Sequence, residues 1–267
     1  MARRQKEYLP RQDAGSVKVL NIRPLGKYLQ DGDWLILCRT HAVVQEVVKS
    51  LVANGCFFKL YGKNFIKYEY IKAIKCWTQL CRGEKVIGAD VVVLYQHMDS
   101  TRINRPHGNF KGEPSDMFNM EILCQHFGLK RFIEFKTQDD SGDKVVIQKD
   151  VSEVMWYDML NGKAIRKQEA YLRNILESGF KLDQDPKIEV STMHASNGGE
   201  RQKVMLISDL SYGPYNASVQ SQEGRDDEAR VFYVAATRAK EELHLIRQTS
   251  GQYEYEPLFI AEREREK

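Results

Sequence analysis

The sequence predicts an α/β fold in which helices cover both faces of a parallel sheet, giving three layers. Three stretches support this prediction, at residues 33–61, 188–207 and 228–246. Each joins a short apolar strand to a helix or to a second strand, and this alternation is typical of parallel sheets. The chain has 267 residues, of which 42% are hydrophobic, so it is long enough for one large domain or two smaller ones.

Residues 33–61 are the first predicted unit, which runs strand, helix, strand. The apolar run at 33–40 is a buried strand, and apolar residues then recur at helical spacing between 43 and 52. Gly55 stands where the C′ residue of a helix belongs, and a second strand follows. Because crossovers between parallel strands are right-handed, we expect Arg39 at the carboxyl end of the first strand, where α/β sheets bind ligands.

The region from 62 to 185 is predicted to be a helical insertion. A core-facing helix includes residues 71–80, whereas the apolar run at 91–95 fits a strand and a buried helix equally well. A turn or hairpin is expected at 139–143, and further helices at 117–127, 153–160 and 164–176. The clearest loop, 99–115, is basic, and its cations either contact a DNA backbone or face water: Arg102, Arg105 and Lys111.

Residues 188–207 are predicted to form a strand, a Gly-Gly turn and a second strand. Gly198 and Gly199 allow the backbone to approach a ligand closely, because neither carries a side chain. Glu200 adds a carboxylate that can accept hydrogen bonds from a hydroxyl group. An ordinary hairpin turn is the alternative interpretation.

Residues 228–240 are predicted to be a helix that ends in a Thr-Arg pair. The apolar residues recur at spacings of three and four, so one face packs inward: Val231, Phe232, Val234 and Ala235. Carboxylates at 226–228 are expected in the first helical turn, where they favour the helix dipole. A strand at 241–246 follows, which places Arg238 between the helix and the sheet. There it either caps the helix or reaches a ligand.

The residue order in these stretches resembles UvrD/Rep helicases of the first helicase superfamily. Glu-x-Arg-x-x-Tyr-Val-x-x-Thr-Arg-Ala at 228–239 resembles their motif VI, residues 188–200 their motif V, and Leu-Cys-Arg-Thr at 37–40 their motif IV. The three follow one another in the family's order. The resemblance implies a RecA-like, P-loop NTPase-type domain at 15–61 and 186–267, a helical insertion at 62–185 and a linker or flexible start at 1–14.

The resemblance also implies a role for each matching residue. Arg238 is expected to act as an arginine finger on the γ-phosphate of ATP, and Arg39 as a second γ-phosphate contact. Nucleotide binding is expected to involve Gly198, Gly199 and Glu200, with Glu200 at the ATP sugar. Single-stranded DNA is expected to run along Thr192, His194 and Asn197. The family's usual lysine is replaced by Asn197, which removes a charge and weakens any phosphate contact there.

No Gly-x-x-x-x-Gly-Lys-Ser/Thr sequence occurs in the chain, so no Walker A loop is predicted here. We therefore expect the second half of an ATP-hydrolysing DNA helicase motor, inactive by itself. ATP and Mg²⁺ are expected to be held largely by a Walker-bearing N-terminal domain in cis or in trans, with single-stranded DNA as the other partner. The alternatives are a stand-alone DNA- or partner-binding module, and a separately encoded subunit of a split helicase.

Composition excludes several other classes of protein. The net charge is +3, so the chain is no polycation of the histone kind. The five cysteines include no Cys-x-x-Cys pair, which predicts neither a disulfide framework nor a metal site. The sequence contains no signal peptide and no apolar run long enough to span a bilayer, so we expect a cytoplasmic protein without a membrane partner.

Overall fold

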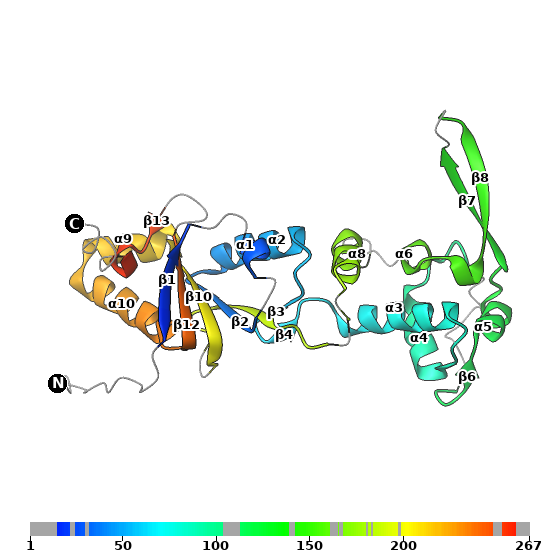
Figure 1. The fold of residues 1–267 in the computed structure, drawn as a ribbon, viewed down its shortest axis with the longest axis horizontal. Coiled ribbons are helices and arrows are strands. Elements are labelled where there is room, and N and C mark those ends of the chain that lie inside the picture. The colour runs from blue at the N-terminus through cyan, green and yellow to red at the C-terminus, as the bar shows by residue number, and fades with distance from the viewer. Residues whose placement is uncertain are drawn as a thin grey trace. The chain divides into compact units, whose positions relative to one another are not determined.

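The computed structural model describes residues 15–21, 25–29, 32–103, 113–138, 142–160, 165, 168–179, 181–182, 184–196, 199–247 and 253–259. The chain divides into two compact units (Figure 1). Unit 1 comprises Met1–Phe65 and Asp185–Lys267, and unit 2 comprises Ile66–Gln184.

Unit 1 is built on a seven-stranded sheet with the order β1-β12-β10-β2-β9-β3-β4. Every neighbouring pair from β1 to β3 is parallel, and β3 and β4 form an antiparallel hairpin. The strands are β1 Ser16–Leu20, β2 Trp34–Cys38, β3 Phe58–Leu60, β4 Lys63–Asn64, β9 Ile188–Thr192, β10 Arg201–Ile207 and β12 Ala239–Ile246. All five residues of β2 are buried, as expected for a central parallel strand covered on both faces.

Helices cover the two faces of this sheet (Figure 1). On one side lie α1 Leu25–Tyr28 and α2 His41–Ala53, and on the other lie α9 Tyr212–Gln220 and α10 Gln222–Ala236. The crossovers from β2 to β3 and from β10 to β12 run in opposite directions across the sheet, so right-handed connections place their helices on opposite faces. These layers confirm the predicted three-layer α/β fold with a parallel sheet, consistent with a RecA-like domain.

The core between the sheet and α10 contains the apolar residues of both. Phe232 and Ala235 of α10 pack in one buried cluster with Leu35 and Leu37 of β2. The ring of Phe232 also stacks on Tyr255, with the ring centroids 4.2 Å apart. Tyr255 lies between β13 Tyr253–Glu254 and the 3₁₀ turn η2 Glu256–Phe259, and β13 pairs with β11 Asp209–Leu210. The C-terminal segment therefore packs against the same face of the sheet as α10.

The opposite face is covered by α2, whose ends follow the predicted pattern. Thr40 precedes the helix, and its Oγ1 accepts a hydrogen bond from the Val43 amide at 3.5 Å. Gly55 has φ 64°, the left-handed conformation that ends many helices at this position. Five apolar side chains of the helix are buried: Val43, Val44, Val47, Val48 and Leu51. The sequence interpretation of this strand-helix-strand unit is confirmed.

A buried histidine lies within the sheet. His244 of β12 is 1% exposed, its Nδ1 lies 3.0 Å from the Tyr28 hydroxyl, and its Nε2 lies 3.0 Å from a Glu242 carboxylate oxygen. Its ring also meets Trp34 edge-on, at 4.9 Å between centroids. Burial lowers the pKa of His244, and the hydrogen bond from His244 helps to lower the pKa of Glu242 from 4.5 to about 2. A neutral imidazole fits this site, donating from Nε2 and accepting from the tyrosine.

Unit 2 contains helices and small antiparallel sheets. Its described helices are α3 Tyr68–Cys81, α4 Gly88–His97, α5 Met120–Phe127, α6 Trp156–Met159 and α8 Glu169–Glu177, with a 3₁₀ turn η1 Val151–Glu153. Strand β5 Val86–Ile87 pairs with β6 Met117–Phe118, and β7 Phe132–Gln138 pairs with β8 Lys144–Asp150. The indole Nε1 of Trp77 donates to the Val154 carbonyl at 2.8 Å, which joins α3 to the segment after η1.

Several element predictions for this region need correction. The predicted helix at 117–127 begins with strand β6, and only Met120–Phe127 is helical, because Asn119 caps the helix through its side chain. The predicted helix at 153–160 is a 3₁₀ turn followed by the short α6. The run at 91–95 lies in α4. The predicted hairpin or turn at 139–143, of which 139–141 lie outside the described residues, falls between two paired seven-residue strands; the insertion is therefore not purely helical.

Candidate functional site

The end of α10 determines where Arg238 lies. The helix ends at Ala236, and Arg238 occupies the turn that leads directly into β12. Its Nε donates to the Val234 carbonyl at 3.0 Å, and its Nη2 lies 3.2 Å from the Thr237 hydroxyl. The partly exposed guanidinium therefore caps the negative end of the helix, which is the first of the two alternatives that the sequence left open.

Two details of this helix differ from the sequence prediction. Val234 is 43% exposed, so it does not belong to the buried stripe, whereas Phe232 and Ala235 do. The helix also begins at Gln222, six residues before Glu228, with the Ser221 hydroxyl accepting from the Gly224 amide at 3.0 Å. The carboxylates at 226–228 consequently lie beyond the first turn, and Glu228 faces the core with Phe232 and Ala235.

The predicted motif V residues lie along the connection from β9 to β10. Thr192 ends β9 and is buried, and its Oγ1 accepts a hydrogen bond from the Ala195 amide at 3.2 Å. His194 is exposed in the turn that follows. Asn197 and Gly198 lie outside the described residues. Gly199 and Glu200 immediately precede β10, and the Glu200 carboxylate lies 3.6 Å from the Lys240 ammonium.

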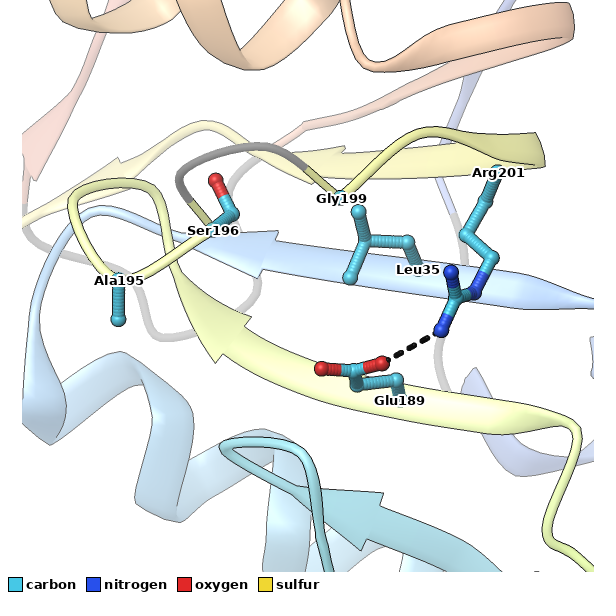
Figure 2. A pocket seen from close by; sticks show the side chains of 6 residues that line it. All are labelled: Leu35, Glu189, Ala195, Ser196, Gly199 and Arg201. Atoms are coloured by element: carbon cyan, nitrogen blue, oxygen red, sulfur yellow. Dashed lines mark hydrogen bonds and ion pairs between the residues drawn. The ribbon is translucent and has the colours of Figure 1, made fainter.

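A small open cavity lies beneath this connection (Figure 2). It has a volume of about 150 Å³ and is lined by Leu35, Glu189, Ala195, Ser196, Gly199 and Arg201. Figure 2 shows the Arg201 guanidinium pointing to the Glu189 carboxylate, and the two groups are 2.8 Å apart. Ligand pockets usually measure about 300–1,000 Å³. The cavity is thus too small to enclose a nucleotide, and the charge of its arginine is already balanced by Glu189.

Arg39 is tied to α10 by a buried ion pair. It follows β2, as predicted, and its Nε and Nη2 each donate at 2.7 Å to one of the two carboxylate oxygens of Glu228. The side chains are 18% and 6% exposed. This is the bidentate arrangement that fixes a guanidinium most firmly. Sequence reasoning did not identify Glu228 as the partner of Arg39, although its spacing of four from Phe232 places it on the buried face.

The structure sorts the predicted site residues onto two edges of the sheet. Arg39 and His194 follow the carboxyl ends of β2 and β9, and Thr192 is the last residue of β9. Gly199, Glu200 and Arg238 instead precede the amino ends of β10 and β12, which are parallel to β2 and β9. Ten residues of α10 and its turn separate Glu228, the partner of Arg39, from Arg238, or about 15 Å at the helical rise. Arg39 and Arg238 are therefore not brought together.

Glu200 and Arg238, by contrast, lie on adjacent strands. The Arg201 amide donates to the Arg238 carbonyl at 3.0 Å, which joins the residue after Glu200 to the motif VI arginine. Lys240, two residues beyond Arg238, approaches Glu200. Lys240 was not singled out from the sequence, and the signal that identifies it is its position at the start of the neighbouring strand.

The cysteines and acidic residues offer no further chemistry in the described part of the chain. None of the five cysteines forms a disulfide; burial raises the pKa of Cys76 to about 12 and those of Cys56 and Cys81 to about 11, which disfavours the reactive thiolate. Among the described residues, no group of three or more His, Cys, Asp or Glu side chains is arranged to hold a metal ion. No helix within those residues is long and apolar enough to cross a membrane.

Residues 130–250 match the family model of the UvrD-like helicase C-terminal domain. The matched segment begins just before β7 and ends beyond β12, so it includes the predicted motif V and motif VI residues on both edges of the sheet. A search of curated proteins found no match to the chain.

Proposed function

Because residues 130–250 match the UvrD-like helicase C-terminal domain, we propose that this chain supplies the second half of an ATP-dependent DNA helicase motor. The observation that carries the proposal is the pairing of Glu200 and Arg238 at the starts of neighbouring strands, connected by the Arg201 to Arg238 backbone hydrogen bond. A nucleotide at this edge has its ribose hydroxyls at Glu200 and its γ-phosphate at Arg238. The 130–250 match and this shared edge support the same interpretation.

Arg238 is suited to act as an arginine finger because its present contacts are weak and easily exchanged. Its guanidinium donates to one carbonyl and approaches one hydroxyl at the end of its own helix. A neutral hydrogen bond of this kind contributes about 0.5–1.5 kcal/mol, whereas a bond to a charged group contributes about 1.5–3 kcal/mol. Moving from the helix end to a phosphate oxygen is therefore favourable, and the planar fork of the guanidinium can bind two phosphoryl oxygens at once.

We assign Arg39 a different part. As a second γ-phosphate contact it would have to leave Glu228, and breaking a buried bidentate pair costs about 3–5 kcal/mol. We propose instead that Arg39 fixes α10, and with it the turn that carries Arg238, to the carboxyl end of β2. A direct contact between Arg39 and the γ-phosphate stays a prediction, and the ion pair with Glu228 argues against it.

The carboxyl edge of the sheet is the proposed track for single-stranded DNA. His194 is exposed there, so its ring is free to contact a base or a phosphate. The Thr192 hydroxyl already accepts the Ala195 amide, so its part is to shape the turn that presents His194. The family's usual lysine is replaced by Asn197, which removes a positive charge, so the DNA contact at this point is correspondingly weaker.

The remaining parts of the reaction belong to a Walker-bearing domain, supplied in cis or in trans. We propose that this domain cradles the β- and γ-phosphates and holds Mg²⁺, which neutralises developing charge when it is bound. This chain's residues then bind the sugar, stabilise charge on the γ-phosphoryl oxygens and hold the strand. A stand-alone DNA-binding module is the second candidate, favoured by the asparagine at position 197.

The test uses a motor reconstituted from this chain and its Walker-bearing domain. Arginine fingers contribute about 10³-fold or more to turnover, so Arg238→Ala should collapse the catalytic rate while ATP binding weakens far less. Arg238→Lys should not restore it, because an ammonium cannot reproduce the planar fork. Arg225→Ala, which removes an exposed arginine of the same helix, is the matched control.

Glu200→Ala should separate sugar binding from chemistry. Its proposed partner is the ribose, so the variant should raise the KM for ATP and leave kcat nearly unchanged. If Arg238→Ala kept turnover within a few-fold of wild type with the protein folded, the finger assignment would be withdrawn. Tight, salt-independent DNA binding by the chain alone would favour the stand-alone module.

A further inference from the structure

The hairpin of β7 and β8 leaves a row of apolar side chains in solvent. Val145, Val146 and Ile147 of β8 are 37%, 54% and 44% exposed. Six of the seven β8 residues are exposed, and the seventh, Asp150, is half-buried. Figure 1 shows the hairpin extending away from the helices of unit 2. Val145 and Ile147 project from one face of the strand and Val146 from the other, so the ribbon exposes apolar side chains on both faces, which favours an interaction with another strand.

The edge of β8 is open to a further strand. Within the described residues the sheet consists of β7 and β8 alone, and a two-stranded ribbon is only marginally stable in water. An edge strand of this length is a template for pairing with another strand. β7 is the less accessible of the two, because Ile133 is buried and the Arg102 guanidinium lies 4.6 Å from the Phe135 ring centroid.

We propose that β8 pairs antiparallel with β8 of a second copy of this chain, about a twofold axis at Ile147. The result is a four-stranded sheet that runs through a dimer, with the order β7-β8-β8-β7. Ile147 then lies opposite itself, and Val146 lies opposite Gln148 of the second copy. On one face of the new sheet the two Ile147 side chains meet, with Val145 of each copy diagonal to Ile147 of the other.

The charges of β8 favour this register. Pairing about Ile147 places Lys144 of each copy opposite Asp150 of the other, which gives an opposite-charge pair at both ends of the new ladder. Lys144 and Asp150 are six residues apart, so both lie on the same face of the strand. Asp150 keeps its present contacts with Arg131 and Ser152 at the base of the hairpin, which hold its carboxylate ionised.

Sliding the strands by one residue removes this complementarity. The slip that moves Lys144 opposite Lys149 also moves Asp143 opposite Asp150, so like charges meet at both ends. The slip in the other direction leaves Asp150 opposite Val145. A one-residue slip also moves every side chain of one strand to the opposite face relative to its partner. One-residue slips are therefore disfavoured. A two-residue slip pairs Asp143 with Lys149 but leaves Asp150 opposite Gly142, whereas pairing about Ile147 gives Asp150 a lysine partner.

The strength of association follows from the size of the surface. A ladder of seven residue pairs buries much less than the roughly 1,600 Å² of a standard protein interface. We therefore expect a reversible dimer that forms in the micromolar range or above and dissociates on dilution.

The first experiment is sedimentation equilibrium of the whole chain over a range of concentrations. Ile147→Lys places two ammonium groups face to face on the twofold axis and should weaken dimerisation at least ten-fold. Ile122→Lys is the matched control, because Ile122 is 40% exposed on α5 of the same unit. It should dimerise like wild type. Both positions are exposed, so neither variant removes a buried contact.

The second experiment tests the register by cysteine crosslinking. In the proposed dimer two cysteines at position 147 face each other with their Cβ atoms about 5 Å apart, so Ile147→Cys should form a disulfide-linked dimer under mild oxidation. The two copies of residue 144 lie about 20 Å apart along the strand. Lys144→Cys should therefore crosslink at least ten-fold less. Wild type supplies the background from its own thiols, of which Cys81 and Cys124 are partly exposed.

Three results would overturn the proposal. One is a chain that stays monomeric up to about 1 mM, well above the range expected for an interface of this size. Another is equal crosslinking at positions 147 and 144, or crosslinking only through a cysteine placed on β7, since each indicates a different pairing. The third is a monomer whose affinity for single-stranded DNA falls with Ile147→Lys and not with Ile122→Lys, because the hairpin is then a nucleic-acid contact.

Discussion

Glu228→Gln should destabilise unit 1 by about 3–5 kcal/mol, the usual cost of removing one partner of a buried ion pair. The substitution keeps the size of the side chain and removes its charge. Arg39 would then remain in place, only 18% exposed, with two of its N–H groups facing a neutral amide. Because the amide has one acceptor oxygen where the carboxylate has two, one of the two hydrogen bonds at 2.7 Å is also lost.

The same helix provides a matched control. Asp227 forms an ion pair with Arg230, and both side chains are 59% exposed. Exposed pairs of this kind contribute about 0.2–1 kcal/mol, so Asp227→Asn should cost less than 1 kcal/mol. The two substitutions are adjacent and both convert a carboxylate to its amide, but they differ in burial. Their difference in unfolding free energy isolates the effect of burying the pair.

Hydrogen exchange followed by mass spectrometry is the assay, because it reports on unit 1 without requiring the whole chain to unfold in one step. Peptides that cover β2 and β10 exchange through the opening of the sheet. A loss of 3–5 kcal/mol accelerates that exchange by about 10² to 10⁴-fold. Peptides from α3 and α4 in unit 2 should exchange at an unchanged rate.

A double substitution checks the physical cause. Arg39→Met with Glu228→Leu replaces both charges by apolar side chains, and such replacements of buried pairs are often neutral. We expect the double variant to be more stable than Glu228→Gln. If Glu228→Gln and Asp227→Asn accelerated exchange equally, or if the double variant were the least stable of all, the ion pair would not be the source of the effect.

The other predictions concern activity, DNA and pH. The isolated chain should show no DNA-stimulated ATP hydrolysis, because it has no Walker A sequence; turnover of a few per second by pure chain would contradict this. It should bind single-stranded DNA weakly, with affinity falling as salt rises in a fluorescence anisotropy titration. Asn197→Lys in the reconstituted motor should increase DNA-coupled ATPase, and an unchanged or lower rate would mean that the asparagine is neutral or compensated elsewhere. Burial lowers the pKa of His244 below 6.5, so the unfolded chain takes up the proton first and stability should fall as the pH drops below about 6.5. Chemical denaturation at pH 7.5 and 5.5 should show this loss, and His244→Gln should reduce the difference; Glu242, with its pKa lowered to about 2, stays ionised throughout this range.

Local sequence patterns were sufficient to predict the helices and strands that bury one face or both. The continuous apolar runs of β2 and β10, the helical spacing of α2 and the glycine after it all predicted the observed structure. Such patterns are reliable because burial of apolar side chains is the main term that fixes an element in place. The run at 91–95 was ambiguous, since an uninterrupted apolar stretch fits either a strand or a buried helix. In the structure residues 91–95 are helical, and α4 packs on α3 with an ion pair of 2.7 Å between Lys72 and Asp90.

Contacts between distant parts of the chain could not be read in this way. Arg39 and Glu228 are 189 residues apart, and no spacing in the sequence joins them. The sequence assigned Arg39 and Arg238 to one phosphate because their motifs resemble those of one family. The strand order places them beyond opposite ends of parallel strands, since a parallel sheet keeps all its carboxyl ends on one edge.

The sequence by itself determined the fold class, the resemblance of its motifs to one helicase family and the strands that carry the candidate site. These depend on the periodicity of apolar residues and on the order of short motifs, both of which are local along the chain. Only the tertiary structure decided which of those residues share an edge, which arginine is held in a buried pair and which strand of the hairpin is left open. Each of these depends on the direction and order of strands in space, and residues far apart in the chain fix that arrangement together.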